Sequence, residues 1–311
     1  MSGPSFRTAR PILGRVKAND FVEAGPHDFR LGAEAAGPAR WWSPYSIDDQ
    51  LKTVWWVGTG KALHSYPEPF YYLAQYRHAT HLARCRVDDL PPTRRRAATL
   101  VMSVGRCGST VLTRMAQAGG LPCLSEPDVL TPLVIDRPAA PHGARIYARA
   151  IDAAMRGWDR VGAGERIVVK LRAQHSNPHH VALAARALDV PRFVFVFREP
   201  QAWARSMVGH FGLPAERLVA LYEAPSAARA VAIRLGAEVR TLRFEDIPAD
   251  PGAVREALGI ERDVDPPRES SQAGTRLAQR PSLDRRGEEA VAGFMARWPS
   301  IKARHGLDLY D

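Results

Sequence analysis

Short, continuous apolar segments, each followed by a segment of helical length, are the feature that most constrains the fold. The clearest is Arg192–Phe197 (RFVFVF), and helical spacing follows it from about Gln201 to Phe211. Such strands alternating with helices indicate βαβ units and a parallel sheet covered on both faces. We therefore expect an α/β fold, a three-layer sandwich around a central parallel sheet. The other predicted elements are strands at 99–104, 167–171 and 237–244 and helices at 111–118, 179–188 and 251–258.

Three regions of the chain differ in composition. Residues 1–95 begin with a weakly periodic arm and continue into a segment rich in Trp and Tyr, with a predicted strand at 51–57 and a helix at 69–81. We interpret them as an N-terminal arm and an aromatic cap, which either packs on the main domain or walls an acceptor pocket. Residues 96–262 hold the alternating strands and helices and form the predicted core. Residues 263–311 are a basic C-terminal segment that we expect to close the site.

The chain carries a surplus of positive charge. Its 311 residues include 43 Lys and Arg against 33 Asp and Glu, a formal net charge of +10. A surplus of this size favours a polyanionic partner, which includes nucleic acid, an acidic surface or a phosphorylated cofactor. The basic residues are spread along the chain, so we expect no nucleic-acid partner. Hydrophobic residues at 45% and charged residues at 24% exclude a mostly disordered chain.

Several absences in the sequence predict the compartment. No apolar run approaches the ~18 residues of a membrane span, so we expect no membrane partner. The first 20 residues lack the apolar segment of a secretory signal. The three cysteines, Cys85, Cys107 and Cys123, cannot build a disulfide framework. We therefore expect a cytoplasmic protein.

A glycine-rich turn follows the first predicted strand of the core. It reads Gly105-Arg106-Cys107-Gly108-Ser109-Thr110, and a helix begins after it. Two glycines, free N–H groups and a helix N-terminus favour an anion cradle, although such a sequence also occurs in plain tight turns. It is not a Walker A loop, which needs a Lys before the hydroxyl residue.

Basic residues end the predicted strands at the edge where parallel sheets bind ligands. Lys170 ends the second strand and Arg198 follows the third, with Ser206 eight residues further on. A guanidinium at a strand end and a hydroxyl on the next helix can reach one phosphate. Taken alone, Lys170, Arg198 and Ser206 are each also typical of an exposed surface side chain. Together with Arg106 they predict direct anion binding without a metal.

Four segments together resemble the sulfotransferases that use 3′-phosphoadenosine 5′-phosphosulfate (PAPS). The resemblance implies the P-loop-like fold of the bacterial members of that family. The resemblance covers roughly residues 97–260. The segments are LVMSVGRCGSTVL (100–112), LSEP (124–127), VFREPQAWARS (196–206) and LRFEDIPADPGAV (242–254).

The resemblance implies roles for individual residues. The 5′-phosphosulfate would lie on the turn, held largely by the backbone N–H groups of Gly105, Arg106, Cys107, Gly108, Ser109 and Thr110. Arg198 and Ser206 would hold the 3′-phosphate, and Phe244 would lie near the adenine where the family has Tyr. Sulfuryl transfer would leave adenosine 3′,5′-bisphosphate.

The chain also departs from the family pattern. Cytosolic sulfotransferases carry a Lys-X-His element whose His is the base, and here the run is Lys170-Leu171-Arg172. Their C-terminal Arg-Lys-Gly loop is absent in recognisable form. Basic C-terminal residues either replace it or form a solvated helix face: Arg276, Arg280, Arg285 and Arg286.

Glu126 is our predicted general base, since it follows the first helix of the core by a short loop and can return to the carboxyl edge of the sheet. It also reads as a helix cap or a surface charge. Lys170 and Arg106 would stabilise charge on the sulfuryl group, and His175 is a second candidate base. An anion-binding turn predicts a lowered pKa for Cys107. No Cys/His/Asx arrangement is visible around Cys107. We therefore expect Cys107 to be a small residue of the anion-binding turn rather than a nucleophile.

The leading hypothesis is a PAPS-dependent sulfotransferase acting on a hydroxyl or amine of a small-molecule acceptor. The aromatic segment at 41–76 suits an apolar or aromatic acceptor, and it reads equally as the interface of a homodimer. A nucleotide-dependent phosphotransferase or kinase on a P-loop fold is the alternative, and it predicts Mg²⁺-dependent binding of ATP or GTP. A non-catalytic nucleic-acid-binding protein is the third reading.

Overall fold

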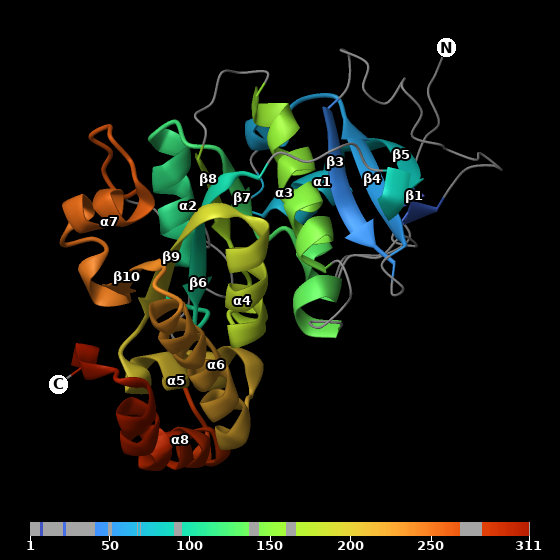
Figure 1. Ribbon diagram of the computed structural model, residues 1–311. Coiled ribbons are helices and arrows are strands. Elements are labelled where there is room, and N and C mark those ends of the chain that lie inside the picture. The colour runs from blue at the N-terminus through green and yellow to red at the C-terminus, as the bar shows by residue number, and fades with distance from the viewer. Residues whose placement is uncertain are drawn as a thin grey trace. The chain divides into compact units, whose positions relative to one another are not determined.

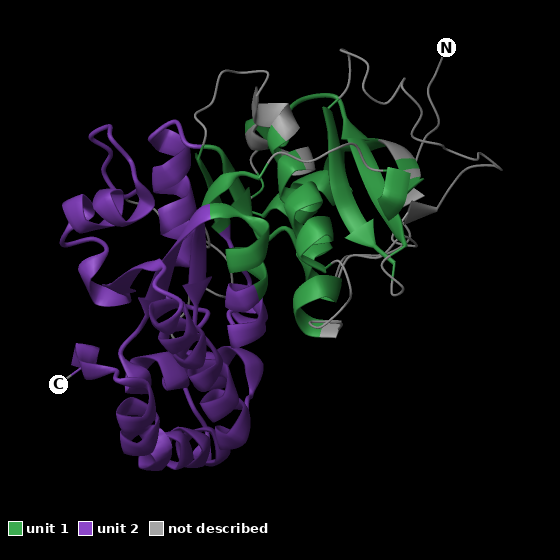
Figure 2. Cartoon of the chain, viewed as in Figure 1, with its two compact units in different colours: residues 1–98, 122–169, 183–189 green, residues 99–121, 170–182, 190–311 purple. Residues whose placement is uncertain are grey.

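The computed structural model describes residues 7–8, 21–22, 41–48, 52–66, 68, 70–89, 95–136, 143–159, 166–267 and 282–310. Contacts divide the chain into two compact units, which Figure 2 colours separately. Unit 1 comprises residues 1–98, 122–169 and 183–189, and unit 2 comprises residues 99–121, 170–182 and 190–311. The units interleave along the chain, so they divide it differently from the three consecutive domains expected from the sequence, which stay a prediction.

The central sheet has five strands in the order β10-β9-β6-β8-β7 (Figure 1). β9 and β10 run parallel, with Arg192 opposite Glu238 and Phe197 opposite Arg243. The predicted α/β fold with a central parallel sheet is confirmed. The strands are β6 (Ala97–Ser103), β7 (Cys123–Ser125), β8 (Arg166–Lys170), β9 (Asp189–Phe197) and β10 (Glu238–Arg243).

The apolar run of β9 forms the centre of the core of unit 2. Its residues 193–197 are all completely buried. Continuous burial indicates a strand covered on both faces, because a half-exposed strand alternates buried and exposed side chains. Helix α8 packs against α5 and α6, and α7 packs against α2. The helices of this unit are α2 (Ser109–Ala118), α5 (Pro200–Phe211), α6 (Ala215–Arg234), α7 (Pro251–Leu258) and α8 (Arg285–His305), and α4 (Pro178–Ala187) begins in it.

Helix α5 begins as its sequence predicts. Glu199 accepts hydrogen bonds from the N–H groups of Gln201 and Ala202 at 2.9 and 2.6 Å, and Pro200 is the first helical residue. A carboxylate cap followed by Pro fixes a helix start, because both suit the unsatisfied first turn. The start of α5 therefore lies directly after Arg198.

Two long helices that the sequence did not predict contain an internal proline. A Pro inside a helical pattern usually indicates a helix end, yet α6 continues through Pro225 and α8 through Pro299. Both helices are held by an aromatic cluster with α5, in which ring centroids lie 4.9–6.5 Å apart. Burial of these rings outweighs the lost helical hydrogen bonds. The cluster consists of Trp203, Tyr222, Phe294 and Trp298.

The aromatic segment in unit 1 forms a three-stranded antiparallel sheet, ordered β3-β4-β5, with α1 (Tyr71–His78) beside it. Gln75 of α1 donates to Ser43 Oγ and to the Pro44 carbonyl at 2.8 and 2.9 Å. The predicted helix at 69–81 ends early, because residues 79–81 pair as β5. The aromatic cap is thus a small packed layer of its own. Its strands are β3 (Trp41–Ile47), β4 (Thr53–Thr59) and β5 (Ala79–Arg86), and unit 1 also contains α3 (Gly143–Asp159) and the short pair β1 (Arg7–Thr8) and β2 (Phe21–Val22).

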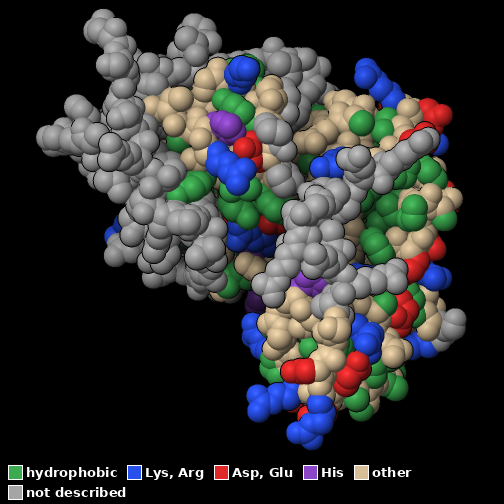
Figure 3. All heavy atoms as spheres, turned by 180° about the vertical axis from the view of Figure 1, so that it is seen from behind, with side chains coloured by type: hydrophobic (Ala, Val, Ile, Leu, Met, Phe, Trp, Pro, Cys, Tyr) green, Lys and Arg blue, Asp and Glu red, His purple; other side chains and the backbone are tan. Residues whose placement is uncertain are grey.

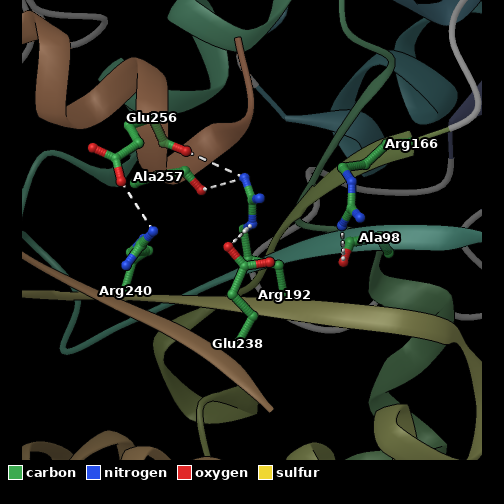
Figure 4. A network of polar contacts seen from close by, with 7 residues as sticks. All are labelled: Ala98, Arg166, Arg192, Glu238, Arg240, Glu256 and Ala257. Carbon is green, nitrogen blue, oxygen red and sulfur yellow. Dashed lines mark hydrogen bonds and ion pairs between the residues drawn. The ribbon is translucent and has the colours of Figure 1, made fainter.

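Many basic side chains of the described residues have structural partners. Arg192 Nε lies 2.8 Å from Glu238 Oε1, and Arg240 Nη2 lies 2.9 Å from Glu256 Oε1 (Figure 4). On the face drawn in Figure 3, Lys and Arg lie at several separate places, interspersed with Asp and Glu. Among the described helices, none is long and apolar enough to cross a bilayer.

Candidate functional site

The glycine turn between β6 and α2 has the backbone of an anion cradle. Gly105 and Gly108 have φ angles of +77° and +70°, which favour glycine, and Gly108 caps α2 without a side-chain hydrogen bond. The first N–H groups of α2 therefore have no side-chain cap, and they carry the positive end of the helix dipole. This backbone suits an anion, as predicted for Cys107, Gly108, Ser109 and Thr110, whereas the N–H group of Gly105 donates to Ser103 Oγ at 3.4 Å.

Two predicted site residues hold left-handed backbone that is unfavourable for their type. Arg106 has a φ of +49° and Glu126 has a φ of +56°. Of the described non-glycine residues, Val190 alone shares this conformation. Such backbone costs about 1–3 kcal/mol and collects at functional sites, so it supports the choice of both residues.

The structure brings Arg198 to the glycine turn. Its Nη1 donates to the carbonyl oxygen of Arg106 at 3.1 Å, and β6 and β9 meet there, since Val104 N donates to Val196 O at 3.4 Å. The guanidinium also lies over the ring of Phe244, with 4.9 Å from its central carbon to the ring centroid. The two predicted anion-binding segments thus form one site within unit 2.

The Nε–H group of Arg198 is a buried donor. In the part of the chain that the structure describes, it donates to no hydrogen-bond acceptor. A buried donor without an acceptor costs about 1–3 kcal/mol, and more when it is charged. This donor is therefore available to an anion, and a phosphate would satisfy it.

Ser206 lies at the same site, on the second turn of α5. It is 9% exposed, and its Oγ accepts from Arg106 Nε at 3.3 Å. Arg106 contacts both members of the predicted pair, Ser206 through its side chain and Arg198 through its carbonyl oxygen. Burial, and to a smaller extent the charge of Arg198, lower the pKa of Arg106.

A buried tryptophan fixes α5 against the turn. Trp203 is completely buried, and its Nε1 donates to the carbonyl oxygens of Val104 and Gly105, both at 3.1 Å. Tyr222 of α6 donates its hydroxyl to the Arg198 carbonyl at 2.9 Å. The turn, the strand end and α5 are thus held in one geometry, as anion binding requires.

Lys170 and Cys107 lie inside the cradle rather than on its surface. Lys170 is 4% exposed and Cys107 is completely buried. Burial raises the pKa of the Cys107 thiol, although the charge of Lys170 acts in the opposite direction. The expectation of a lowered pKa is wrong, because desolvation of the thiolate exceeds the attraction of nearby charge. Cys107 is a small filling residue.

Glu126 lies in unit 1, directly after β7, and is partly buried. Pro127, and not Glu126, caps the short helix at 128–130, so the alternative of a helix cap fails. His175, the second candidate base, is completely buried after β8. Arg276 and Arg280 lie outside the described residues, while Arg285 and Arg286 begin α8.

No protein-family model and no curated protein matches the chain. The solved structures similar to it include three sulfotransferases or sulfotransferase domains. A sulfotransferase from Alicyclobacillus acidocaldarius shares 19% identity, with 70% of this chain and 97% of that one covered and a TM-score of 0.42. The sulfotransferase domain of the Synechococcus PCC 7002 olefin synthase shares 14% identity, with 67% of this chain and 98% of that one covered and a TM-score of 0.38. That of the curacin biosynthetic pathway has 15% identity, coverage of 70% and 99% and a TM-score of 0.39.

The sequence analysis missed one polar residue of the site. His210 Nε2 lies 3.2 Å from Arg106 Nη2. A signal for it exists, since His210 follows Ser206 by four residues and so shares its helix face. The side chains of Trp203 and Tyr222 donate hydrogen bonds to backbone carbonyls. No sequence pattern predicts these contacts.

Phe244 packs directly on the glycine turn, which predicts a large cost for a side chain at Gly108. A Cβ there would lie 2.7 Å from two ring carbons of Phe244, and the φ of +70° adds backbone strain. We expect G108A to lower the free energy of unfolding by about 2–4 kcal/mol, measured by urea denaturation.

The matched control is Gly236, which has a φ of +68° but open space around its Cβ position. We expect G236A to cost only the strain, about 1–2 kcal/mol. In an F244A background the cost of G108A should fall to that of G236A. Equal costs for the two alanines in the wild-type background would contradict the contact.

Proposed function

We propose that the protein is a PAPS-dependent sulfotransferase that moves a sulfuryl group to a hydroxyl or amine of a small-molecule acceptor. The observation that carries the proposal is the convergence of Arg106, Arg198 and buried Ser206 beside a glycine turn, with the Arg198 Nε unsatisfied. These donors suit a phosphate dianion, which charge-assisted hydrogen bonds hold best.

The residues present fit a nucleotide with two separate anionic ends. The backbone N–H groups at 106–110 would hold the 5′-phosphosulfate on the positive end of α2. The unsatisfied Arg198 Nε and the Ser206 hydroxyl would hold the 3′-phosphate. The ring of Phe244, which lies on the turn and under Arg198, offers an apolar surface for the adenine.

Transfer needs charge stabilisation and a base. Bound PAPS supplies an activated sulfuryl group, and the acceptor attacks it in line. Lys170, buried beside the turn, would stabilise the charge that develops on the sulfuryl and bridging oxygens. Glu126 would accept the proton of the acceptor as the new bond to sulfur forms.

The acceptor class is a further part of the proposal. The aromatic layer of β3, β4, β5 and α1 supports an apolar or aromatic small molecule, because such a layer supplies ring surfaces. Three free cysteines are compatible with a reducing compartment, where small molecules rather than secreted glycans are the acceptors.

Thermal unfolding tests the nucleotide. Adenosine 3′,5′-bisphosphate at a hundred times its Kd should add about 2.7 kcal/mol of stability, a rise in Tm of several degrees, without Mg²⁺. Adenosine 5′-phosphate should add less. No shift at millimolar bisphosphate would overturn the proposal, and a larger Mg²⁺-dependent shift with ATP would favour a kinase.

A further inference from the structure

His210 has hydrogen-bonding roles that its neighbours dictate. Its Nδ1 lies 2.8 Å from the carbonyl oxygen of Ser206, and its Nε2 lies 3.2 Å from Arg106 Nη2. A carbonyl oxygen only accepts, so Nδ1 carries the proton; a guanidinium only donates, so Nε2 accepts. His210 is therefore the neutral tautomer that offers a lone pair to Arg106.

The Arg106 guanidinium is held at two points on one face of α5. Nε donates to Ser206 Oγ at 3.3 Å and Nη2 donates to His210 Nε2 at 3.2 Å. The two acceptors are four residues apart and so lie one above the other on the helix. The backbone of Arg106 belongs to the glycine turn, whereas its charged end belongs to α5.

Two arginines, Arg106 and Arg198, meet at the glycine turn. Arg198 donates to the carbonyl of Arg106, and its charge lowers the pKa of Arg106, after burial as the larger cause. Two adjacent guanidiniums repel each other, and an anion with two negative charges between them removes that repulsion. Holding Arg106 there before the anion arrives also lowers the entropic cost of binding.

We propose that His210 is a positioning residue that directs the Arg106 side chain to the Arg198–Ser206 subsite, so that two arginines bind the 3′-phosphate. The inference rests on the proposed function for the identity of the anion. The preferred ligand of the subsite is a phosphate monoester dianion, and Arg106 contributes its backbone to the 5′ end and its charge to the 3′ end.

The first experiment needs no nucleotide. The exchange rate of the Arg106 Nε–H proton is measured by NMR, with the signal assigned by its loss in R106K. H210F keeps a ring on α5 but removes the acceptor, and we expect exchange about tenfold faster. H210Q places an amide oxygen near the position of Nε2 and should keep the rate close to that of the wild type.

The second experiment measures the ratio of the affinities for adenosine 3′,5′-bisphosphate and adenosine 5′-phosphate by calorimetry. We expect H210F to lower this ratio about tenfold with unchanged affinity for the 5′-phosphate, and H210Q to restore it. H305F, a histidine replacement near the end of α8, is the matched control and should leave both readouts unchanged.

The two experiments separate the inference from the proposed function. A wild-type protein without preference for the 3′-phosphate overturns the proposed function and the phosphate assignment, while the exchange rates still decide whether His210 positions Arg106. Wild-type exchange and a wild-type affinity ratio in H210F overturn the inference, whatever nucleotide binds. Equal losses in H210F and H210Q also overturn it, because they show that packing and not the acceptor matters.

Discussion

R198A is expected to abolish the stabilisation of the protein by adenosine 3′,5′-bisphosphate. Arg198 lies on the glycine turn, and its buried Nε lacks an acceptor among the described residues. Removing one partner of a buried, hydrogen-bonded charge pair costs about 2–5 kcal/mol of binding, which weakens binding about 30-fold or more. Calorimetry and the nucleotide-induced change in Tm measure the effect.

The specificity of the R198A effect has its own controls. Affinity for adenosine 5′-phosphate should change little, since that ligand lacks the group that Arg198 holds. R198K keeps the charge but not the planar fork, so it should recover only part of the affinity. Arg240, which pairs with Glu256 on the surface (Figure 4), is the matched arginine, and R240A should bind normally. Normal bisphosphate binding by a folded R198A would contradict the site.

E126Q is expected to stop turnover while nucleotide binding stays intact. The amide keeps the size of the side chain but cannot accept the proton of the acceptor, and loss of a general base costs about 10²–10⁴ in rate. The measurement is transfer of labelled sulfuryl from PAPS to a panel of phenols and amines, with kcat compared between the variant and the wild type. Because the proposed nucleotide contacts lie in unit 2, the Kd for adenosine 3′,5′-bisphosphate should not change.

A control substitution at a second glutamate distinguishes the loss of the general base from the loss of a negative charge in general. Glu261 is exposed in the segment after α7, and E261Q should turn over at the wild-type rate. The left-handed backbone of Glu126 is not altered by the change to Gln, so the fold should be kept. Wild-type turnover in E126Q would remove Glu126 as the base and leave His175 as the candidate to replace next.

Local sequence predicted several elements of unit 2, among them β9 and the start of α5, because these depend on short-range chemistry. An unbroken apolar run such as RFVFVF has few options besides a buried strand, and Glu199-Pro200 fixes the start of α5. Residues that end strands of one parallel sheet meet at one edge. For this reason the sequence alone predicts that Arg198 lies near the glycine turn.

Long-range packing decided what local patterns could not. α6 and α8 continue through prolines because buried rings hold them, and that stabilisation comes from residues far apart in the sequence. The thiol of Cys107 was expected to be acidic from the charges near it, and burial reversed the direction.

By itself, the amino-acid sequence determined the alternating strands and helices around the central parallel sheet, the glycine turn and the basic residues at the strand ends. Only the tertiary structure decided where the Arg106 side chain lies. Its backbone position follows from the turn, but its long side chain can reach several groups, and the contacts with Ser206 and His210 on α5 select one of them. Side-chain direction depends on which surfaces meet after folding, and local sequence does not encode it.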